Sequence, residues 1–158
     1  MNCLRQLRGE DKQLFDRLNF KFYGIMDPSV RAVIEREKFS NLTFFNPISK
    51  EELFAEINKS HFCLLFYAPE HSFSMNTKFF EYISNRKPIL LFSNKGYTSE
   101  FIEKNKLGYV LSPENTYQKF REVVLHFVNN TVEFDRNFDI SQFSLQNLSK
   151  QLINTIED

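Results

Sequence analysis

Three polar residues, Thr77, Lys78 and Glu81, have the chemistry to hold a nucleotide. On a helix, at ~100° per residue, these three residues fall on one side together with Asn85. The opposite side of the same helix carries Met75, Phe79, Phe80, Tyr82 and Ile83. The pattern predicts an amphipathic helix over residues 75–86 whose polar side faces solvent.

The start of this helix is suited to an anion. The first N–H groups of a helix lack internal partners, and the helix dipole favours negative charge there, so a phosphate fits near residues 74–77. One turn further in, the two oxygens of Glu81 can accept hydrogen bonds from both hydroxyls of a ribose. The alternative is that Lys78 and Glu81 form only a solvated ion pair, worth ~0.2–0.5 kcal/mol. Spacing alone leaves both interpretations open.

Other candidate groups are sparse. Lys95 and His71 lie in predicted loops, where a solvated lysine and an incidental histidine are the simpler interpretations. The three histidines and the two cysteines, Cys3 and Cys63, are scattered without metal-ligand spacing. We therefore expect no metal and no cofactor, and we expect Cys63 to be a buried free thiol.

The elements that position these residues alternate between strands and helices. Strands are predicted at 20–23, 42–45, 62–67, 88–92 and 109–111, with helical patterns between them. This order predicts a Rossmann-like, doubly wound parallel sheet of about five strands, with 62–67 as a central strand buried on both faces. Ligands of such sheets bind beyond the carboxyl ends of the strands, in the loops at 24–28, 46–49, 67–76, 93–98 and 112–115.

Several helix boundaries are also marked. Asp27 and Pro28 are a cap and a first-turn residue, and Ser49 with Glu52 fits a capping box. The N-terminal residues 1–18 suggest a helix interrupted near Gly9. A further helical pattern at 145–156 predicts a C-terminal helical extension over residues 131–158.

The bulk composition places limits on function. At 158 residues, the chain is expected to form a single domain over residues 1–158. Acidic and basic residues balance at 20 each, so we expect no bulk attraction to nucleic acid. No apolar stretch reaches the ~20 residues of a membrane span, and the first residues are too polar for a signal peptide, which predicts a cytoplasmic protein.

The run from Lys78 to Leu90 carries a resemblance. With Glu81, Tyr82, Lys87 and Pro88, it resembles the K-x-x-E-Y-x-x-x-x-K-P-I-L segment of GT-B glycosyltransferases, in retaining family 4, also called glycosyl transferases group 1. Other stretches are similar in the same order, and together they span residues 18–130: Phe22-Tyr23-Gly24, 41–53, 62–67 and Gly108-Tyr109-Val110.

The resemblance implies the C-terminal, donor-binding domain of a hexosyltransferase. Such a domain binds a nucleoside diphosphate sugar, whose sugar passes to an acceptor hydroxyl in glycan, lipopolysaccharide or capsule biosynthesis, with no obligatory metal. Lys78 and Glu81 match the catalytic pair, and Glu81 matches the ribose ligand. The remaining donor-binding positions are a diphosphate loop, a nucleobase-contacting backbone and a strand end lining the cleft: Ser74, Met75, Asn76 and Thr77; Pro47 and Ile48; and Tyr67.

The chain also departs from that family. Many members have an acidic residue eight positions before the ribose glutamate, where this chain has Phe73. The acceptor domain, the first strand of the donor domain and its basic loop have no counterpart here. We therefore expect a fragment of a two-domain enzyme that is inactive alone. Peripheral membrane association is an expectation for the complete enzyme and not for this chain.

Two other classes of α/β domain are alternatives. A non-catalytic α/β nucleotide-binding or interaction module is favoured by Phe73 and by the missing basic loop. A receiver-type signalling domain requires an Asp closing the central strand, and Tyr67 and Ala68 stand there instead. Binding of nucleoside diphosphates distinguishes the donor domain from the bare interaction module.

Overall fold

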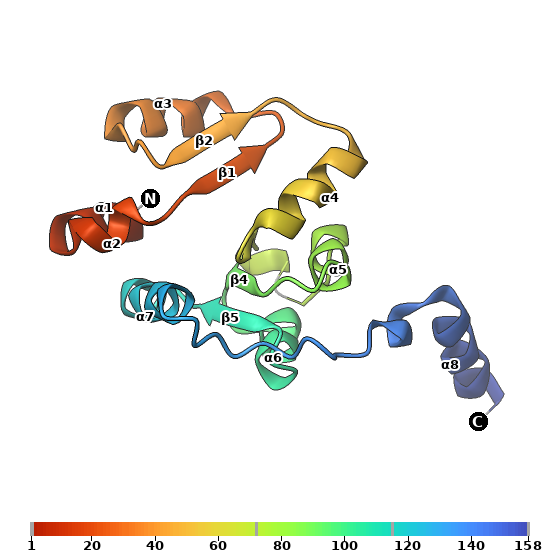
Figure 1. The fold of residues 1–158 in the computed structure, drawn as a ribbon. Helices are drawn as coiled ribbons and strands as arrows, with labels where there is room; N and C mark the ends of the chain where they lie inside the picture. The colour runs from red at the N-terminus through yellow and green to blue at the C-terminus, as the bar shows by residue number, and fades with distance from the viewer. Residues whose placement is uncertain (1, 72, 115, 158) are drawn as a thin grey trace. The chain divides into compact units, whose positions relative to one another are not determined.

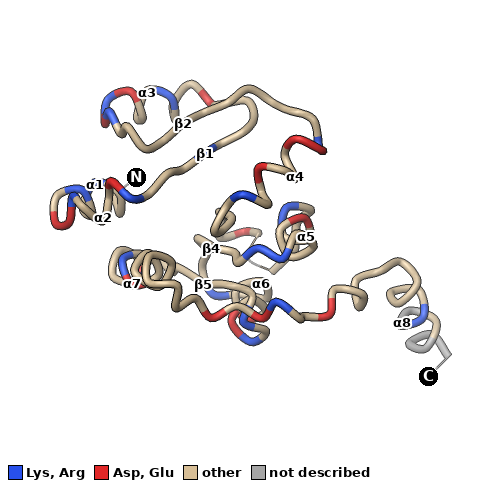
Figure 2. The backbone as a smooth tube through the Cα atoms, in the orientation of Figure 1, with Lys and Arg blue, Asp and Glu red and all other residues tan. Residues whose placement is uncertain are grey.

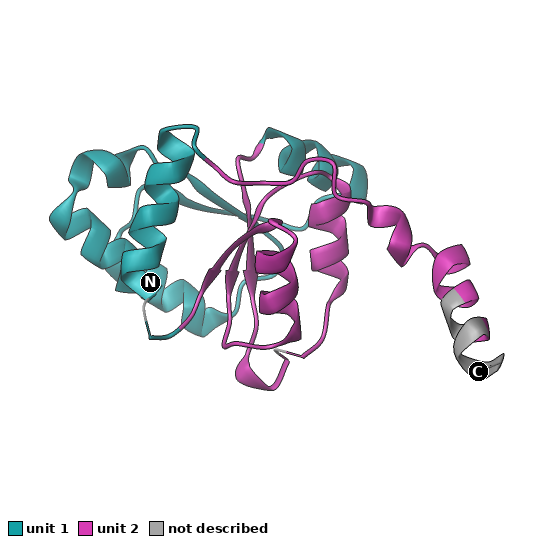
Figure 3. Cartoon of the chain, turned by 90° about the horizontal axis from the view of Figure 1, so that it is seen from below, with its two compact units in different colours: residues 1–59, 113–131 teal, residues 60–112, 132–158 magenta. Residues whose placement is uncertain are grey.

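The computed structural model describes residues 2–71, 73–114 and 116–157 and confirms the α/β, Rossmann-like fold (Figure 1). The described residues contain five strands, and every strand pair is parallel. The strands form a two-stranded sheet, β1-β2, and a three-stranded sheet, β3-β4-β5. These sheets belong to two compact units, which Figure 3 draws in different colours and which are described separately here.

Unit 1 comprises residues 1–59 and 113–131. Its strands pair in register, with Phe20 opposite Leu42 and Tyr23 opposite Phe45. Helix α1 packs against both α2 and α7. The elements of unit 1 are α1 (Asn2–Glu10), α2 (Lys12–Asp16), β1 (Phe20–Tyr23), α3 (Pro28–Glu37), β2 (Leu42–Phe45), α4 (Lys50–Lys59) and α7 (Thr116–Val128).

Unit 2 comprises residues 60–112 and 132–158. Its central strand β4 pairs with β3 on one side and with β5 on the other, and α5 lies against β3 and β4. The elements of unit 2 are β3 (Cys63–Phe66), the 3-10 helix η1 (Pro69–His71), α5 (Thr77–Ser84), β4 (Ile89–Phe92), α6 (Tyr97–Lys104), β5 (Gly108–Leu111), the 3-10 helix η2 (Ile140–Phe143) and α8 (Leu145–Glu157).

The core of unit 2 lies between its sheet and helices α5 and α6. Its buried members are Leu65 of β3, Phe79 and Ile83 of α5, Ile89 and Leu91 of β4, Ile102 of α6, Leu107 just before β5, and Phe138 of the C-terminal segment. Ile89, Leu90 and Leu91 are completely buried. Strand β4 is thus covered on both faces, as expected for the middle strand of a parallel sheet.

The predicted place of the 62–67 strand is wrong. In the three-stranded sheet this strand, β3, is an outer strand, and the side chain of Phe66 is 59% exposed. The 88–92 strand takes the central place instead. Both runs are continuously apolar, and hydrophobicity alone does not decide which of two apolar strands has a neighbour on each side.

The predicted interruption near Gly9 is present and falls two residues after it. Helix α1 continues through Gly9 to Glu10. The break follows at Asp11, whose side chain accepts a 2.9 Å hydrogen bond from the Leu14 amide and caps α2. A capping carboxylate can begin a new helix at once, whereas a glycine in the interior of a helix lowers its stability without ending it.

The caps predicted at Asp27 and Ser49 are confirmed. Asp27 caps α3 through the Ser29 amide at 2.8 Å, with Pro28 in the first turn. At α4, the Ser49 amide donates to Glu52 at 2.9 Å and the Glu52 amide donates to the Ser49 hydroxyl at 3.2 Å, which completes the capping box. The hydrogen bond from the Ser49 backbone also lowers the pKa of Glu52.

Replacing the capping serine tests this local assignment. Ser49→Ala is expected to reduce the free energy of unfolding by ~1 kcal/mol, because the Glu52 amide loses its acceptor. Urea denaturation measures the change. Ser40→Ala, at an exposed turn residue of the same unit, is the control and should change stability by less than ~0.5 kcal/mol. Equal stability of the two variants would contradict the cap.

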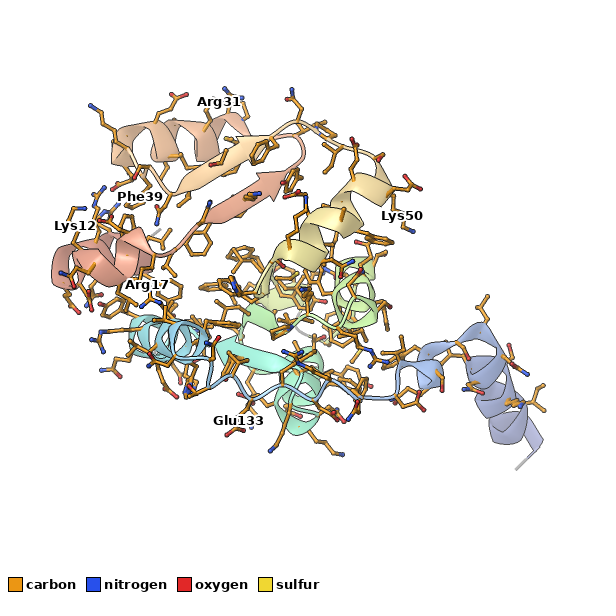
Figure 4. The ribbon with its side chains drawn as sticks, viewed as in Figure 1. Lys12, Arg17, Arg31, Phe39, Lys50 and Glu133 are labelled. Atoms are coloured by element: carbon orange, nitrogen blue, oxygen red, sulfur yellow. The ribbon has the colours of Figure 1, made fainter. Side chains whose placement is uncertain are left out.

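Unit 1 is further held by aromatic stacking and ion pairs. Phe22 stacks on Phe44 across β1 and β2 with ring centroids 4.7 Å apart. The guanidinium of Arg5 binds Glu37, joining α1 to α3, while Arg8 lies 4.6 Å above the ring of Phe39, which Figure 4 labels. Figure 2 shows basic and acidic residues interspersed along the helices of each unit.

In unit 2, residues 132–143 lie against α5, α6 and β5 before α8 begins. The amide of Glu133, labelled in Figure 4, donates to the Tyr109 hydroxyl at 3.0 Å, and the Asp135 amide donates to the Lys106 carbonyl at 2.9 Å. Aromatic residues of this segment pack on the core, and the ring centroids of Phe143 and Phe80 are 5.1 Å apart. The expected C-terminal helix is present as α8.

Candidate functional site

Helix α5 begins with two free backbone donors. Asn76 is its N-cap, and the Asn76 side chain accepts a 3.0 Å hydrogen bond from the Phe79 amide. The next two amides, of Thr77 and Lys78, donate no hydrogen bond to any described residue. Both residues are exposed. The helix therefore presents two N–H groups to solvent at its positive end, a geometry that suits a phosphate oxygen.

Lys78 and Glu81 form the ion pair that their spacing predicts. The Lys78 amine lies 2.8 Å from Oε2 of Glu81, and the two side chains are 50% and 17% exposed, respectively. The other oxygen, Oε1, accepts no hydrogen bond from the described residues. Glu81 thus has a largely covered stem and one carboxylate oxygen available for a ligand.

The pair is nearly neutral as a unit, and this affects what can bind beside it. A lone carboxylate one turn from the helix start repels a diphosphate, whereas the Lys78 ammonium cancels that charge at 2.8 Å. The long lysine side chain can also leave the carboxylate for a nearby phosphate oxygen, since half of it is exposed. The geometry is compatible with both the ligand-binding and the ion-pair interpretations.

The opposite side of α5 is fixed to the core, as its apolar pattern predicts. Phe79 and Ile83 are buried, and the Phe79 ring lies 5.2 Å from Phe80 and 6.0 Å from Phe101. Burial raises the pKa of Tyr82 to about 12, with smaller contributions from Cys63 and Glu81. Thr77 and Lys78, on the polar side of α5, are exposed.

The loop that leads into α5 is held by two hydroxyl groups. The Tyr67 hydroxyl accepts a 3.0 Å hydrogen bond from the Asn76 amide. The Thr98 hydroxyl, at the start of α6, donates a 2.7 Å hydrogen bond to the carbonyl of Ser74. Thr98 is completely buried. Sequence reasoning missed Thr98, because it belongs to no motif and lies 24 residues from its partner.

The Lys87-Pro88 part of the motif has a structural role. The Lys87 amine donates a 2.9 Å hydrogen bond to the Ser60 carbonyl, and the Pro88 carbonyl accepts from the Cys63 amide at 2.9 Å. These bonds align the starts of β3 and β4. Just before them, Arg86 has a left-handed backbone (φ 54°), and its guanidinium donates to the Phe138 carbonyl.

The sequence-predicted site residues fall in both units. Pro47 (exposed) and Ile48 (half-buried) lie in unit 1, in the loop between β2 and α4. The others lie in unit 2, on one loop and the helix that follows it: Tyr67, Ser74, Met75, Asn76, Thr77, Lys78 and Glu81. The structure therefore brings together the predicted diphosphate and ribose positions within unit 2.

The weaker candidates stay weak. Lys95 makes a 3.8 Å contact with Glu100, and both side chains are strongly exposed. His71 is an exposed residue of η1, Phe73 is 70% exposed, and Ser72 lies outside the described residues. Cys63 is a buried free cysteine, as predicted, and burial raises the pKa of its thiol to about 11.

Metal-ligand clusters and membrane-spanning helices are both absent from the described part of the chain. It contains no group of three or more His, Cys, Asp or Glu side chains able to hold a metal ion. None of its helices combines the length and the apolar character needed to cross a membrane.

Comparison with known proteins adds no relative. The chain matches no protein-family model, no curated protein and no solved structure. A functional assignment therefore depends on the residues at the start of α5 and on their chemistry.

Proposed function

We propose that this chain is a donor-binding domain of a glycosyltransferase and binds a nucleoside diphosphate sugar at the start of α5. The observation that carries the proposal is Glu81. Its carboxylate is mostly covered, is paired with Lys78 through one oxygen, keeps the other oxygen available, and lies one turn beyond two free amides. A ribose beside Glu81 places its diphosphate toward the amides of Thr77 and Lys78.

The proposed binding mode assigns a task to each group. The amides of Thr77 and Lys78 bind phosphate oxygens, and Glu81 accepts from the ribose hydroxyls. When the sugar is transferred to an acceptor hydroxyl, negative charge develops on the departing diphosphate. The Lys78 ammonium and the positive end of α5 stabilise that charge without a metal. The family resemblance of residues 78–90 supports the same assignment.

Calorimetric titration with uridine and guanosine diphosphates tests this proposal. We expect at least one of them to bind, and Glu81→Gln to weaken binding by about tenfold or more, since a hydrogen bond to a charged group contributes ~1.5–3 kcal/mol. The 2′-deoxy form of the binding nucleotide should lose affinity for the wild-type protein. Removing the 2′-hydroxyl should reduce the affinity for Glu81→Gln much less, because that hydroxyl is the proposed partner of Glu81.

Glu100→Gln is the matched control. It removes the same charge from the same unit at a carboxylate that is 61% exposed. This variant should bind as the wild-type protein does. Unchanged affinity in Glu81→Gln would exclude the ribose role, and a folded wild-type protein that binds neither nucleotide would exclude the donor site.

The alternative is a non-catalytic interaction module. It is favoured by Phe73, an exposed aromatic residue. Many members of the glycosyltransferase family that the chain resembles have an acidic residue at this position. The absence of nucleoside diphosphate binding by the folded chain would favour this module over the donor domain.

A further inference from the structure

The loop before α5 is hydrogen-bonded to a side chain from another helix. Thr98 is the second residue of α6 and is completely buried, yet its hydroxyl is satisfied by one strong hydrogen bond, 2.7 Å, to the Ser74 carbonyl. A buried hydroxyl without a partner is costly, so this bond constrains both the hydroxyl and the loop. Ser74 stands two residues before the N-cap of α5.

The Ser74 carbonyl has an alternative partner. In a helix, the amide of residue i donates to the carbonyl of residue i−4, so the Lys78 amide would donate to Ser74 if α5 began two residues earlier, with Ser74 as its N-cap. In the structure the N-cap is Asn76, the Lys78 amide does not form that bond, and the Ser74 carbonyl accepts from Thr98. A carbonyl held toward α6 disfavours this earlier start of α5, in which the Lys78 amide would be occupied.

A second hydroxyl acts on the same loop. The Tyr67 hydroxyl accepts a 3.0 Å hydrogen bond from the Asn76 amide, so this amide already has a partner within the protein. The Tyr67 backbone amide donates to the Phe92 carbonyl at 2.9 Å, which anchors Tyr67 at the end of the β3-β4 pair. The loop is therefore held from the sheet at Asn76 and from α6 at Ser74.

We propose that Thr98 is a positioning residue: by holding the Ser74 carbonyl, it keeps the Lys78 amide available to the anion. The anion-binding part of this proposal rests on the proposed function of the α5 start. The effect of Thr98 on the hydrogen bonds of the Ser74 carbonyl is independent of that function.

The test compares Thr98→Val with Thr98→Ser in the full chain. Valine has nearly the same shape without the hydroxyl, and serine keeps the hydroxyl. Amide hydrogen exchange, measured by NMR, reports the Lys78 amide directly. In Thr98→Val the released carbonyl accepts from this amide, and its exchange should slow by about tenfold. In Thr98→Ser the exchange should match the wild-type rate.

Binding of uridine or guanosine diphosphate is the second measurement. Thr98→Val should bind about tenfold more weakly, and Thr98→Ser should restore the affinity. Tyr67→Phe, which frees the Asn76 amide, serves if Thr98→Val does not fold. It should speed exchange at Asn76 and leave the Lys78 amide unchanged as long as Thr98 is present.

The two proposals fail in different ways. A wild-type chain that binds no nucleotide excludes the proposed function, while Lys78 exchange still decides the role of Thr98. An unchanged exchange rate of Lys78 in Thr98→Val overturns the positioning role, whatever the affinity. If Thr98→Val does not fold, a Lys78 amide that slows in Tyr67→Phe overturns it as well.

Discussion

Gly108→Ala is expected to destabilise unit 2 by at least ~3 kcal/mol. Gly108 begins β5 opposite Ile89, with a backbone φ of +148° that side-chain-bearing residues rarely adopt. A Cβ atom there would overlap the Ile89 carbonyl oxygen and lie 2.6 Å from the Ile89 nitrogen. These are backbone atoms of the completely buried central strand, so no side-chain rotation relieves the overlap.

Two other glycines separate the causes of this loss. Gly24 has a similar φ of +142°, but nothing lies within 4 Å of its Cβ position, so Gly24→Ala measures backbone strain alone, ~1–2 kcal/mol. Gly9 lies in α1 with open space around it, and Gly9→Ala should stabilise the chain by up to ~1 kcal/mol. Urea denaturation compares the three variants. If Gly108→Ala cost no more than Gly24→Ala, the close approach of β4 to β5 would be disproved.

Phe79→Ala is expected to cost ~3–5 kcal/mol of unfolding free energy, the range for large-to-small changes in a packed core. Phe79 is completely buried, and its ring contacts Phe80 and Phe101 edge to face. The change leaves a cavity beneath α5, one residue after Lys78. Because proteins are stable by only ~5–15 kcal/mol, the loss should be visible as a large shift in the urea midpoint.

Phe73→Ala is the matched control for this experiment. Phe73 belongs to the same unit and is the same kind of residue, but it is 70% exposed. Its replacement should change stability by no more than ~0.5 kcal/mol. A cost below ~1 kcal/mol for Phe79→Ala would show that the apolar side of α5 is not packed as described.

The sequence predicted features that depend on neighbouring residues. The strands at 20–23 and 42–45 have the predicted bounds, and the caps at Asp27 and Ser49 form the predicted hydrogen bonds. The division of α5 into an apolar and a polar side is confirmed, as is the pairing of Lys78 with Glu81. Helical periodicity and capping are local, so the order of residues carries them.

The tertiary structure decided what distant segments do to one another. It made β4, rather than β3, the middle strand of the three-stranded sheet, and it brought the Ile89 backbone so close to residue 108 that only glycine fits. It also joined Thr98 to Ser74 across 24 residues. Side-chain types alone cannot specify such pairings, because each depends on how strands and helices far apart in the chain pack together. The sequence by itself therefore determined the polar groups at the start of α5, and the packing of α6 and the sheet brought the Thr98 and Tyr67 hydroxyls to the loop before it.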